Sequence, residues 1–449
     1  MFRLFAISCV FALLVLPAVA RARPHYGGTL RVETEGDPWQ RPNGLARRLV
    51  YDGLTSLDSS GEVQAALATG WESDNADHRW QFRLRQGVHF HDGSPLTATA
   101  VVQSLNLDCP ANCPWTAVHA VGSTVVFTSD SPMPNLPALL ARDEFLIALT
   151  VTADGKTPSG NIGTGPFQVT SFNNGVLALA ANESGWQGRP FADAIEIRAH
   201  RQVHDQWLDL SIGRVDVVEV PAEMIRQAQQ QRLTLLVSPS AELLALEVTD
   251  GGALANPMLR AAVAASVDRS ALSNVIFQKQ GEATASVLPQ SLTGFAFLFP
   301  VDRDLNTAHE LRGGLTTPTL SLSVDGDGAM HLAAQRIELN LKETGFNVQE
   351  VSAGSAPHAD LMLRKISLES GEPSAVLDGV LRSVGQPAVP ADSSPASLYK
   401  AEHDFVDRHT LIPLVDLPRA YAMGVRIRDL APDAHGLPDL AGASLGDAQ

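Results

Sequence analysis

The segment 319–351 reads TLSLSVDGDGAMHLAAQRIELNLKETGFNVQEV. In its middle, Ala333, Ile337 and Leu341 recur at four-residue spacing, which places them on one face of a helix, and Gly345 is a typical helix end. The apolar runs on either side have the length and composition of strands. The predicted elements are a strand, a helix and a strand, over 319–324, about 329–344 and 346–351. That order predicts a parallel crossover unit, and therefore an α/β fold.

A second helix is predicted upstream of this unit, from residue 257. Asn256 is a favoured N-cap residue and Pro257 suits the first helical position. Leu259, Val263 and Val267 then follow at four-residue spacing, with alanines between them. We expect a closely packed buried helix.

The N-terminal third contains strand patterns. A short strand is expected over 29–34. Residues 80–84 alternate apolar and polar, and Gly87 then turns the chain into 88–93, which predicts a hairpin. A helix should begin near Thr97.

Size and charge restrict the class of protein. The chain has 449 residues, 45% hydrophobic and 18% charged, which is an ordinary globular balance. One core rarely supports more than about 250–300 residues, so at least two lobes are expected. The net charge of -16 repels phosphate backbones and anionic lipid, which argues against nucleic acid as a ligand.

The N-terminus has the pattern of an export signal. Arg3 precedes an apolar run over 5–19, which is shorter than the about 18 residues that a membrane helix needs. We interpret residues 1–22 as a signal peptide, cleaved after Ala20 or Ala22, which predicts a periplasmic protein. An uncleaved anchor is the alternative.

Two cysteines follow the signal, Cys109 and Cys113. In the oxidising compartment that export implies, we expect them to form a local disulfide. Metal binding is the alternative, and it would need further ligands such as His91 or His119.

Several segments, in their order along the chain, match known sequence motifs. They are GGTLRV at 27–32, VYDGL at 50–54, LATGWE at 67–72, the block 80–98, GTGPF at 163–167, the helix 257–272 and DRHTLIPL at 407–414. Together they resemble the extracellular solute-binding proteins of family 5, the dipeptide, oligopeptide and nickel class of ABC importers.

The resemblance implies a two-lobed α/β fold of the type II periplasmic binding protein kind, with a hinge and a discontinuous first lobe. Lobe one would span 23–249, with a subdomain at about 51–157, and would be completed by 405–449. Lobe two would be a shortened segment over 250–404.

The function that the resemblance implies is the periplasmic solute-binding component of an ABC importer. Such a protein captures a peptide-like or other small solute between its lobes and delivers it to permease subunits in the inner membrane. We expect a monomer without a cofactor and without enzymatic activity. The alternative is a degenerate or sensory homologue that acts through a protein partner and imports nothing.

Candidate ligand contacts follow from position in the family. The loop after the first strand offers Glu35, Asp37 and Trp39, while Trp115 and Arg142 lie in regions that border the cleft. Tryptophan supplies flat apolar area, and arginine supplies a fork for a carboxylate. The alternatives are core packing for the two tryptophans and a surface ion pair for Arg142.

The second lobe departs from the family pattern. Peptide-binding members carry, after a strand that contains tryptophan, an aspartate that pairs with the amino terminus of the ligand. Here 359–368 has no tryptophan, and the basic pair Arg364 and Lys365 stands in place of the acidic loop. Ordinary dipeptide binding is therefore not expected. The pair faces either an anionic solute or only solvent.

Three segments match motifs of other protein classes, but the residues around them do not fit those motifs. The GASLG sequence at 442–446 matches a hydrolase elbow but has no room for the helix that must follow it. The acidic run 325–328 has Arg336 where a calcium loop needs glutamate. His200 and His204 have zinc-pair spacing but lack the glutamate base of a metalloprotease. We therefore expect no catalytic site and no metal site.

Overall fold

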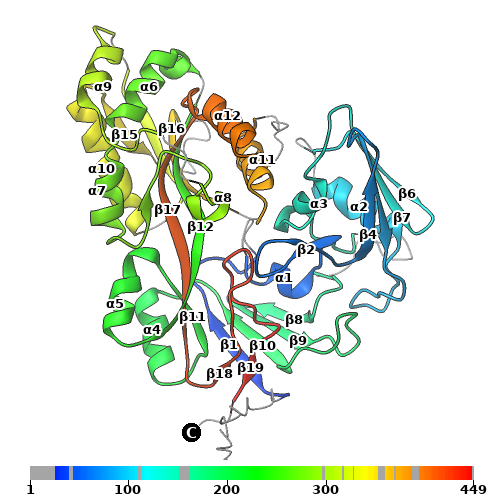
Figure 1. The fold of residues 1–449 in the computed structure, drawn as a ribbon. Coiled ribbons are helices and arrows are strands. Elements are labelled where there is room, and N and C mark those ends of the chain that lie inside the picture. Colours follow the sequence, from blue (N-terminus) through cyan, green and yellow to red (C-terminus); the bar gives the residue numbers. More distant parts are fainter. Residues whose placement is uncertain are drawn as a thin grey trace, which may run out of the picture.

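The computed structural model describes residues 26–39, 44–108, 113–150, 161–249, 251–295, 299–315, 318–326, 328–351, 359–368, 371–386 and 394–446. The predicted signal peptide lies outside these ranges. Figure 1 shows a tall part built on one long sheet, and a smaller β-rich subdomain beside it. Within the described ranges, no helix is both long and apolar enough to cross a membrane.

An 11-stranded sheet runs through the tall part of the molecule. Its order is β15 (Val348–Val351), β14 (Leu320–Val324), β16 (Leu361–Ser367), β12 (Thr234–Val248), β17 (Leu411–Met423), β11 (Val217–Val220), β1 (Thr29–Glu33), β10 (Ala194–Arg198), β9 (Val176–Ala181) and β8 (Phe167–Asn173), with β13 (Glu282–Ala283) paired to β17. The two long strands β12 and β17 belong to both lobes.

Lobe one is built around β1, which confirms the strand expected over 29–34. β1 pairs in parallel with β10 and β11, and its Leu30 and Val32 are buried. Helices α4 (Val203–Ser211) and α5 (Ile225–Gln230) pack beside β11. The short pair β18 (Ile427–Arg428) and β19 (Ser444–Leu445) closes this lobe near the end of the chain.

The subdomain has its own sheet and core. Its antiparallel order is β4 (Ala68–Ser73), β5 (Arg79–Leu84), β7 (Thr124–Thr128) and β6 (Ala117–Val121), beside the hairpin β2 (Thr55–Leu57) and β3 (Val63–Ala65) and helices α2 (Ala98–Asp108) and α3 (Leu136–Leu139). Phe82 and Phe127 are fully buried in the core. The helix expected near Thr97 is α2.

The hairpin expected from 80–84 and 88–93 is wrong. β5 pairs with β4 on one side and with β7 on the other, so both of its edges are occupied. Residues 88–93 form no strand. The Phe90 N–H instead donates to the Ser94 carbonyl at 2.8 Å in a turn, and the His91 N–H donates to the Gly163 carbonyl at 2.9 Å.

Lobe two contains the predicted crossover unit. β14 and β15 pair in parallel, with Leu320 opposite Val348, and α10 (Ala329–Glu343) connects them. α10 packs on one sheet face with α6 (Pro257–Ser266), whose N-cap Asn256 accepts the Met258 N–H at 3.0 Å, as predicted. The opposite face carries α11 (Pro373–Ser383) and α12 (Pro395–Val406).

The two lobes are joined by β12 and β17, and their pairing is irregular at the crossing. The register shifts between Val237 and Ser240 and again between Ser240 and Glu242, and Ser240 lies opposite Pro418. Bulges bend a strand, and proline withholds a ladder hydrogen bond. The sheet is therefore weakest where it passes from one lobe to the other, which is where a hinge is needed.

Candidate functional site

The lobes touch along a seam between the subdomain of lobe one and α11 of lobe two. The Gly371 N–H, just before α11, donates to the Gly61 carbonyl in the β2–β3 turn at 3.1 Å. Close by, the Ser374 hydroxyl donates to Asn135 Oδ1 at 3.1 Å. These contacts cross from one lobe to the other, so the structure shows the lobes closed.

Arg142 crosses the seam. This residue lies between α3 and the short helix η1 (Asp143–Phe145) and is only 4% exposed. Its Nη2 lies 3.4 Å from Glu144 Oε1. The guanidinium lies against Gly379 of α11, where an added Cβ would fall 1.8 Å from Nη1. Burial raises the pKa of the neighbouring Asp378, and the charges of Arg382 and Arg142 oppose that rise.

The lobe-one wall of the seam is a cluster around Asp143. Helix α1 (Arg47–Val50) supplies two arginines: Arg48 Nε lies 2.8 Å from Asp143 Oδ1, and Arg47 Nη2 donates to the Asp143 carbonyl at 2.8 Å. His435 comes from the C-terminal loop, and its Nδ1 lies 3.4 Å from Arg48 Nη2. Burial, and then the charge of Arg48, holds the pKa of His435 well below its usual range, so the imidazole is neutral at neutral pH.

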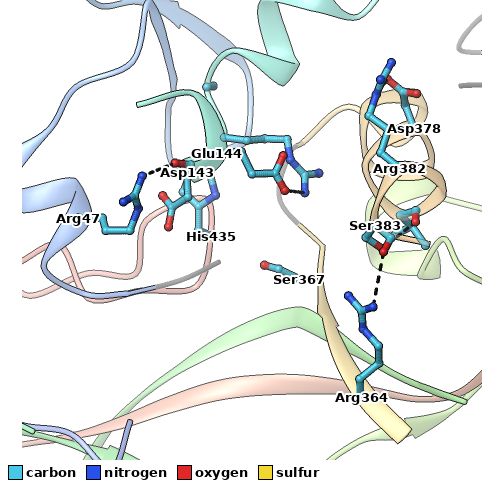
Figure 2. Close-up of polar contacts among 12 residues, drawn as sticks. Arg47, Asp143, Glu144, Arg364, Ser367, Asp378, Arg382, Ser383 and His435 are labelled. Carbon is cyan, nitrogen blue, oxygen red and sulfur yellow. Dashed lines mark hydrogen bonds and ion pairs between the residues drawn. The ribbon is translucent and has the colours of Figure 1, made fainter. Parts of the chain in front are cut away.

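The lobe-two wall is formed by β16 and α11, and Figure 2 shows it facing the cluster around Asp143. Arg364 points from β16 toward the end of α11, where its Nη1 lies 3.5 Å from the Ser383 carbonyl and 3.0 Å from Glu247 Oε2. An arginine at the C-terminal end of a helix complements the helix dipole. Arg382 Nε approaches Asp378 Oδ2 at 3.3 Å.

Arg419 of β17 connects the two walls at the floor of the seam. Its Nη1 donates to the His435 carbonyl at 2.6 Å, on the lobe-one side. Its Nη2 donates to the Ser367 hydroxyl at 3.2 Å, on the lobe-two side. Its Nε lies 3.2 Å from Glu242 Oε1, and Lys365 Nζ lies 3.6 Å from the other oxygen of the same carboxylate. The floor is therefore a charged network at the hinge strands.

Glu219 of β11 lies at the lobe-one end of this floor. Its Oε2 accepts the Glu35 N–H at 2.9 Å. Burial raises the pKa of Glu219 to about 7, the charges of Glu35 and Glu242 add to the rise, and the Glu35 hydrogen bond and Arg419 oppose it. The carboxyl group is therefore partly protonated near neutral pH.

The seam gathers basic side chains from both lobes, although the whole chain carries a net charge of -16. The basic residues are Arg47, Arg48, Arg142, Arg364, Lys365, Arg382 and Arg419, and their acidic partners are Asp143, Glu144, Glu242, Glu247 and Asp378. Guanidinium groups bind carboxylates with paired, charge-assisted hydrogen bonds. The seam is thus suited to a small anionic group.

The residues predicted from sequence lie at different distances from this seam. Arg142 crosses it, and Glu35 reaches its floor through the bond to Glu219. Asp37 is exposed and accepts the Trp39 N–H at 2.8 Å, while the half-buried Trp39 ring lies 6.3 Å from that of Tyr51. Trp115 is packed in the subdomain core, 4.9 Å from the Phe127 ring. Ligand contact by any of the five stays a prediction.

Sequence reasoning did not identify Arg419, the Arg47–Arg48 pair or Asp378. One signal was present: Arg419 is a charged residue within the long apolar run 411–423, where a charge must find a buried partner. The partners themselves come from distant segments, so the sequence does not name them.

The described ranges contain no group of three histidine, cysteine or acidic side chains placed to hold a metal ion. Cys113 is disulfide-bonded. Its expected partner, Cys109, lies outside the described residues, so the pairing stays a prediction.

Two lobes that share paired hinge strands and enclose a polar seam define the class of two-lobed solute-binding proteins. The family model of bacterial extracellular solute-binding proteins, family 5, matches residues 62–388. The chain belongs to this family, which confirms the resemblance seen in its motifs.

Two curated relatives are similar to this chain, and the second is named as a binding protein. An uncharacterised protein of Bacillus subtilis (strain 168), YhjP, is 35% identical over 173 residues, which cover 36% of this chain and 29% of that protein. The probable di/tripeptide-binding protein 5 of Pseudomonas aeruginosa (strain UCBPP-PA14) is 25% identical over 416 residues, 78% of this chain and 77% of that one.

A solved structure shares the fold. The binding protein AgaA of A. tumefaciens R10, in complex with agropinic acid, superposes with a TM-score of 0.78 at 18% sequence identity, covering 94% of this chain and 99% of that one. This likeness confirms the expected two-lobed fold.

Proposed function

We propose that the protein is the periplasmic solute-binding component of an ABC importer, which captures a small carboxylate-bearing solute in the seam and presents it to permease subunits in the inner membrane. Lobe one over 23–249 and 405–449, and lobe two over 250–404, would close on the solute. Family membership supports the general role. Two related proteins, described as binding di/tripeptides and agropinic acid, are consistent with a peptide-like or acidic solute.

The arrangement of arginines across the seam carries the proposal. Arg47 and Arg142 come from lobe one, and Arg364 and Arg382 come from lobe two. Arg142 reaches Gly379 of lobe two, so the arginines of the two lobes face each other across the seam when the lobes are in contact. A carboxylate bound between them therefore stabilises the closed state over the open one, which is the differential affinity that a hinge-closing binding protein requires.

A thermal-shift screen of the purified chain tests the proposal. The panel contains dipeptides and tripeptides, the same peptides with amidated C-termini, small dicarboxylic acids and neutral sugars. A carboxylate-bearing binder at about 100 times its dissociation constant should stabilise the protein by about 2.7 kcal/mol. The amidated peptides should bind at least about tenfold more weakly, because they lose charge-assisted bonds to the arginines.

A pair of variants locates the site. Arg142→Gln should remove the shift, whereas Arg226→Gln, at an exposed position on α5, should keep it. If no compound in the panel shifts the unfolding temperature, solute capture is contradicted, and the role of a homologue acting through a protein partner is favoured. Equal binding of acids and amides would contradict the arginine seam as the site.

A further inference from the structure

A separate pocket has a lining that contains none of the seam arginines. Its lining includes Glu282 of β13, Asp416 of β17, and Leu288, Phe299 and Val301 from the connection that leads to α9 (Leu305–Arg312). Glu282 and the connection belong to lobe two, whereas Asp416 comes from β17, one of the two strands that run through both lobes.

Asp416 is a buried carboxylate that lines this pocket without a matching charge. The residue is only 3% exposed, and its Oδ1 is buried without a hydrogen-bond partner. Glu282 lies directly opposite it in the β13–β17 pair. Like charges directly opposite each other destabilise a sheet unless something neutralises them.

Glu402 of α12 brings a third carboxylate to the same place. It is 0% exposed, and its Oε1 accepts the Ser286 hydroxyl at 2.7 Å and the Leu288 N–H at 2.9 Å, while Oε2 is buried without a partner. Burial, and then the charges of Glu282 and Glu402, raises the pKa of Asp416 well above its usual range. In the described part of the chain, none of the three acids has an ion-pair partner.

The pocket lining also includes apolar side chains. Leu288 and Val301 line it, and the Phe299 ring stacks on Tyr399 of α12 with centroids 5.5 Å apart. An ammonium group with a short apolar substituent suits this mixed lining: the charge meets the carboxyl groups, and the hydrocarbon meets the apolar side chains. A multivalent metal ion does not fit as well, because the described residues hold no three-ligand cluster.

We propose that this pocket is a binding site for a small organic ammonium ion, with Asp416 and Glu282 as its anionic partners. The site goes beyond solute capture in the seam, because its lining includes none of the seam arginines.

The experiment measures binding of n-butylammonium chloride to the full chain by calorimetry and by thermal shift. The neutral isostere 1-butanol and potassium chloride serve as parallel probes. Saturable binding of butylammonium is expected, with at least about tenfold weaker binding of 1-butanol, because the alcohol lacks the charge-assisted bonds. Potassium should neither bind with comparable affinity nor displace butylammonium.

Three variants assign the binding to this pocket. Asp416→Asn and Glu282→Gln should each weaken butylammonium by about tenfold or more. Asp416→Asn replaces a buried carboxyl group, whose pKa is raised, with a neutral amide of similar shape, so the fold should be retained. Glu282 is exposed at its strand. Glu310→Gln, at an exposed position on α9, is the charge-matched control and should bind like the wild type.

Each contrary result overturns the proposal. These results are the absence of saturable butylammonium binding, equal binding of 1-butanol or potassium, and binding that both pocket variants retain. Loss of butylammonium binding in Arg142→Gln would indicate that butylammonium binds in the seam, and would also contradict the proposal. Failure of the acidic-solute screen would leave this test unaffected, because the two sites share no residue.

Discussion

The carboxyl group of Glu219 shows how one residue couples the hinge floor to pH. Its folded pKa is about 7, raised chiefly by burial, against an ordinary value of 4.5. Between these pH values, the native state retains a proton that the unfolded chain has lost. Stability therefore falls as the pH rises through this window, and the loss is complete above the folded pKa.

Replacing this carboxyl should flatten that dependence. In Glu219→Gln, the amide oxygen can still accept the Glu35 N–H, but the group no longer titrates. The free energy of unfolding of the wild type, relative to the variant, should decrease by about 1.4 kcal/mol per pH unit between about pH 5 and pH 7. Urea unfolding at a series of pH values measures this difference. Parallel pH profiles for the two proteins would contradict it.

At the scale of elements, closure depends on two turns whose backbones meet. The β2–β3 turn at Gly61 contacts the loop before α11 at Gly371, and a Cβ on Gly371 would lie 2.4 Å from the Gly61 Cα. A side-chain tip can move aside, but these atoms are backbone, held by a hairpin and a helix. A glycine at 371 is therefore needed for the lobes to approach this closely.

Gly371→Ala should hold the lobes apart without unfolding either one, because no positive φ is required at this position. Small-angle X-ray scattering should give a larger radius of gyration for this variant than for the wild type. Gly70→Ala is the control, since a Cβ at that position meets nothing within 4 Å. Identical scattering from all three proteins would show that the contact does not limit closure.

At the scale of the whole molecule, one hydrophobic core is shared by both lobes, whereas the subdomain has a core of its own. One core contains residues of both lobes, such as Val218 and Leu322, because the long strands β12 and β17 pass through it. Among the residues that the structure describes, the buried core of the subdomain comes from the range between Leu54 and Leu149. The subdomain should therefore open as a unit of its own, while the lobes unfold together.

Phe127→Ala tests this division. Removing a fully buried phenylalanine costs about 3–5 kcal/mol, and the loss should fall on the subdomain. Hydrogen exchange should show reduced protection in β5 and β7 and unchanged protection in β12. Phe346→Ala, in the shared core, should instead reduce protection across β12 and β14. A uniform loss in both variants would show a single cooperative unit.

The sequence by itself determined the features that depend on near neighbours. Four-residue apolar spacing and Gly345 predicted β14, α10 and β15, and Asn256 predicted the start of α6. These predictions succeed because helix periodicity and capping are satisfied within a few residues. The motif series likewise identified the family, because it samples the whole chain.

Only the tertiary structure decided the rest. The strand partners of β5 depend on β4 and β7, and the charged floor unites Arg419 with Ser367 and His435 from separate segments. Long-range packing decides which buried charges are neighbours, and a buried charge must pair with one of those neighbours. Local patterns carry no information about those neighbours, so the seam and the acidic pocket became visible only in the folded chain.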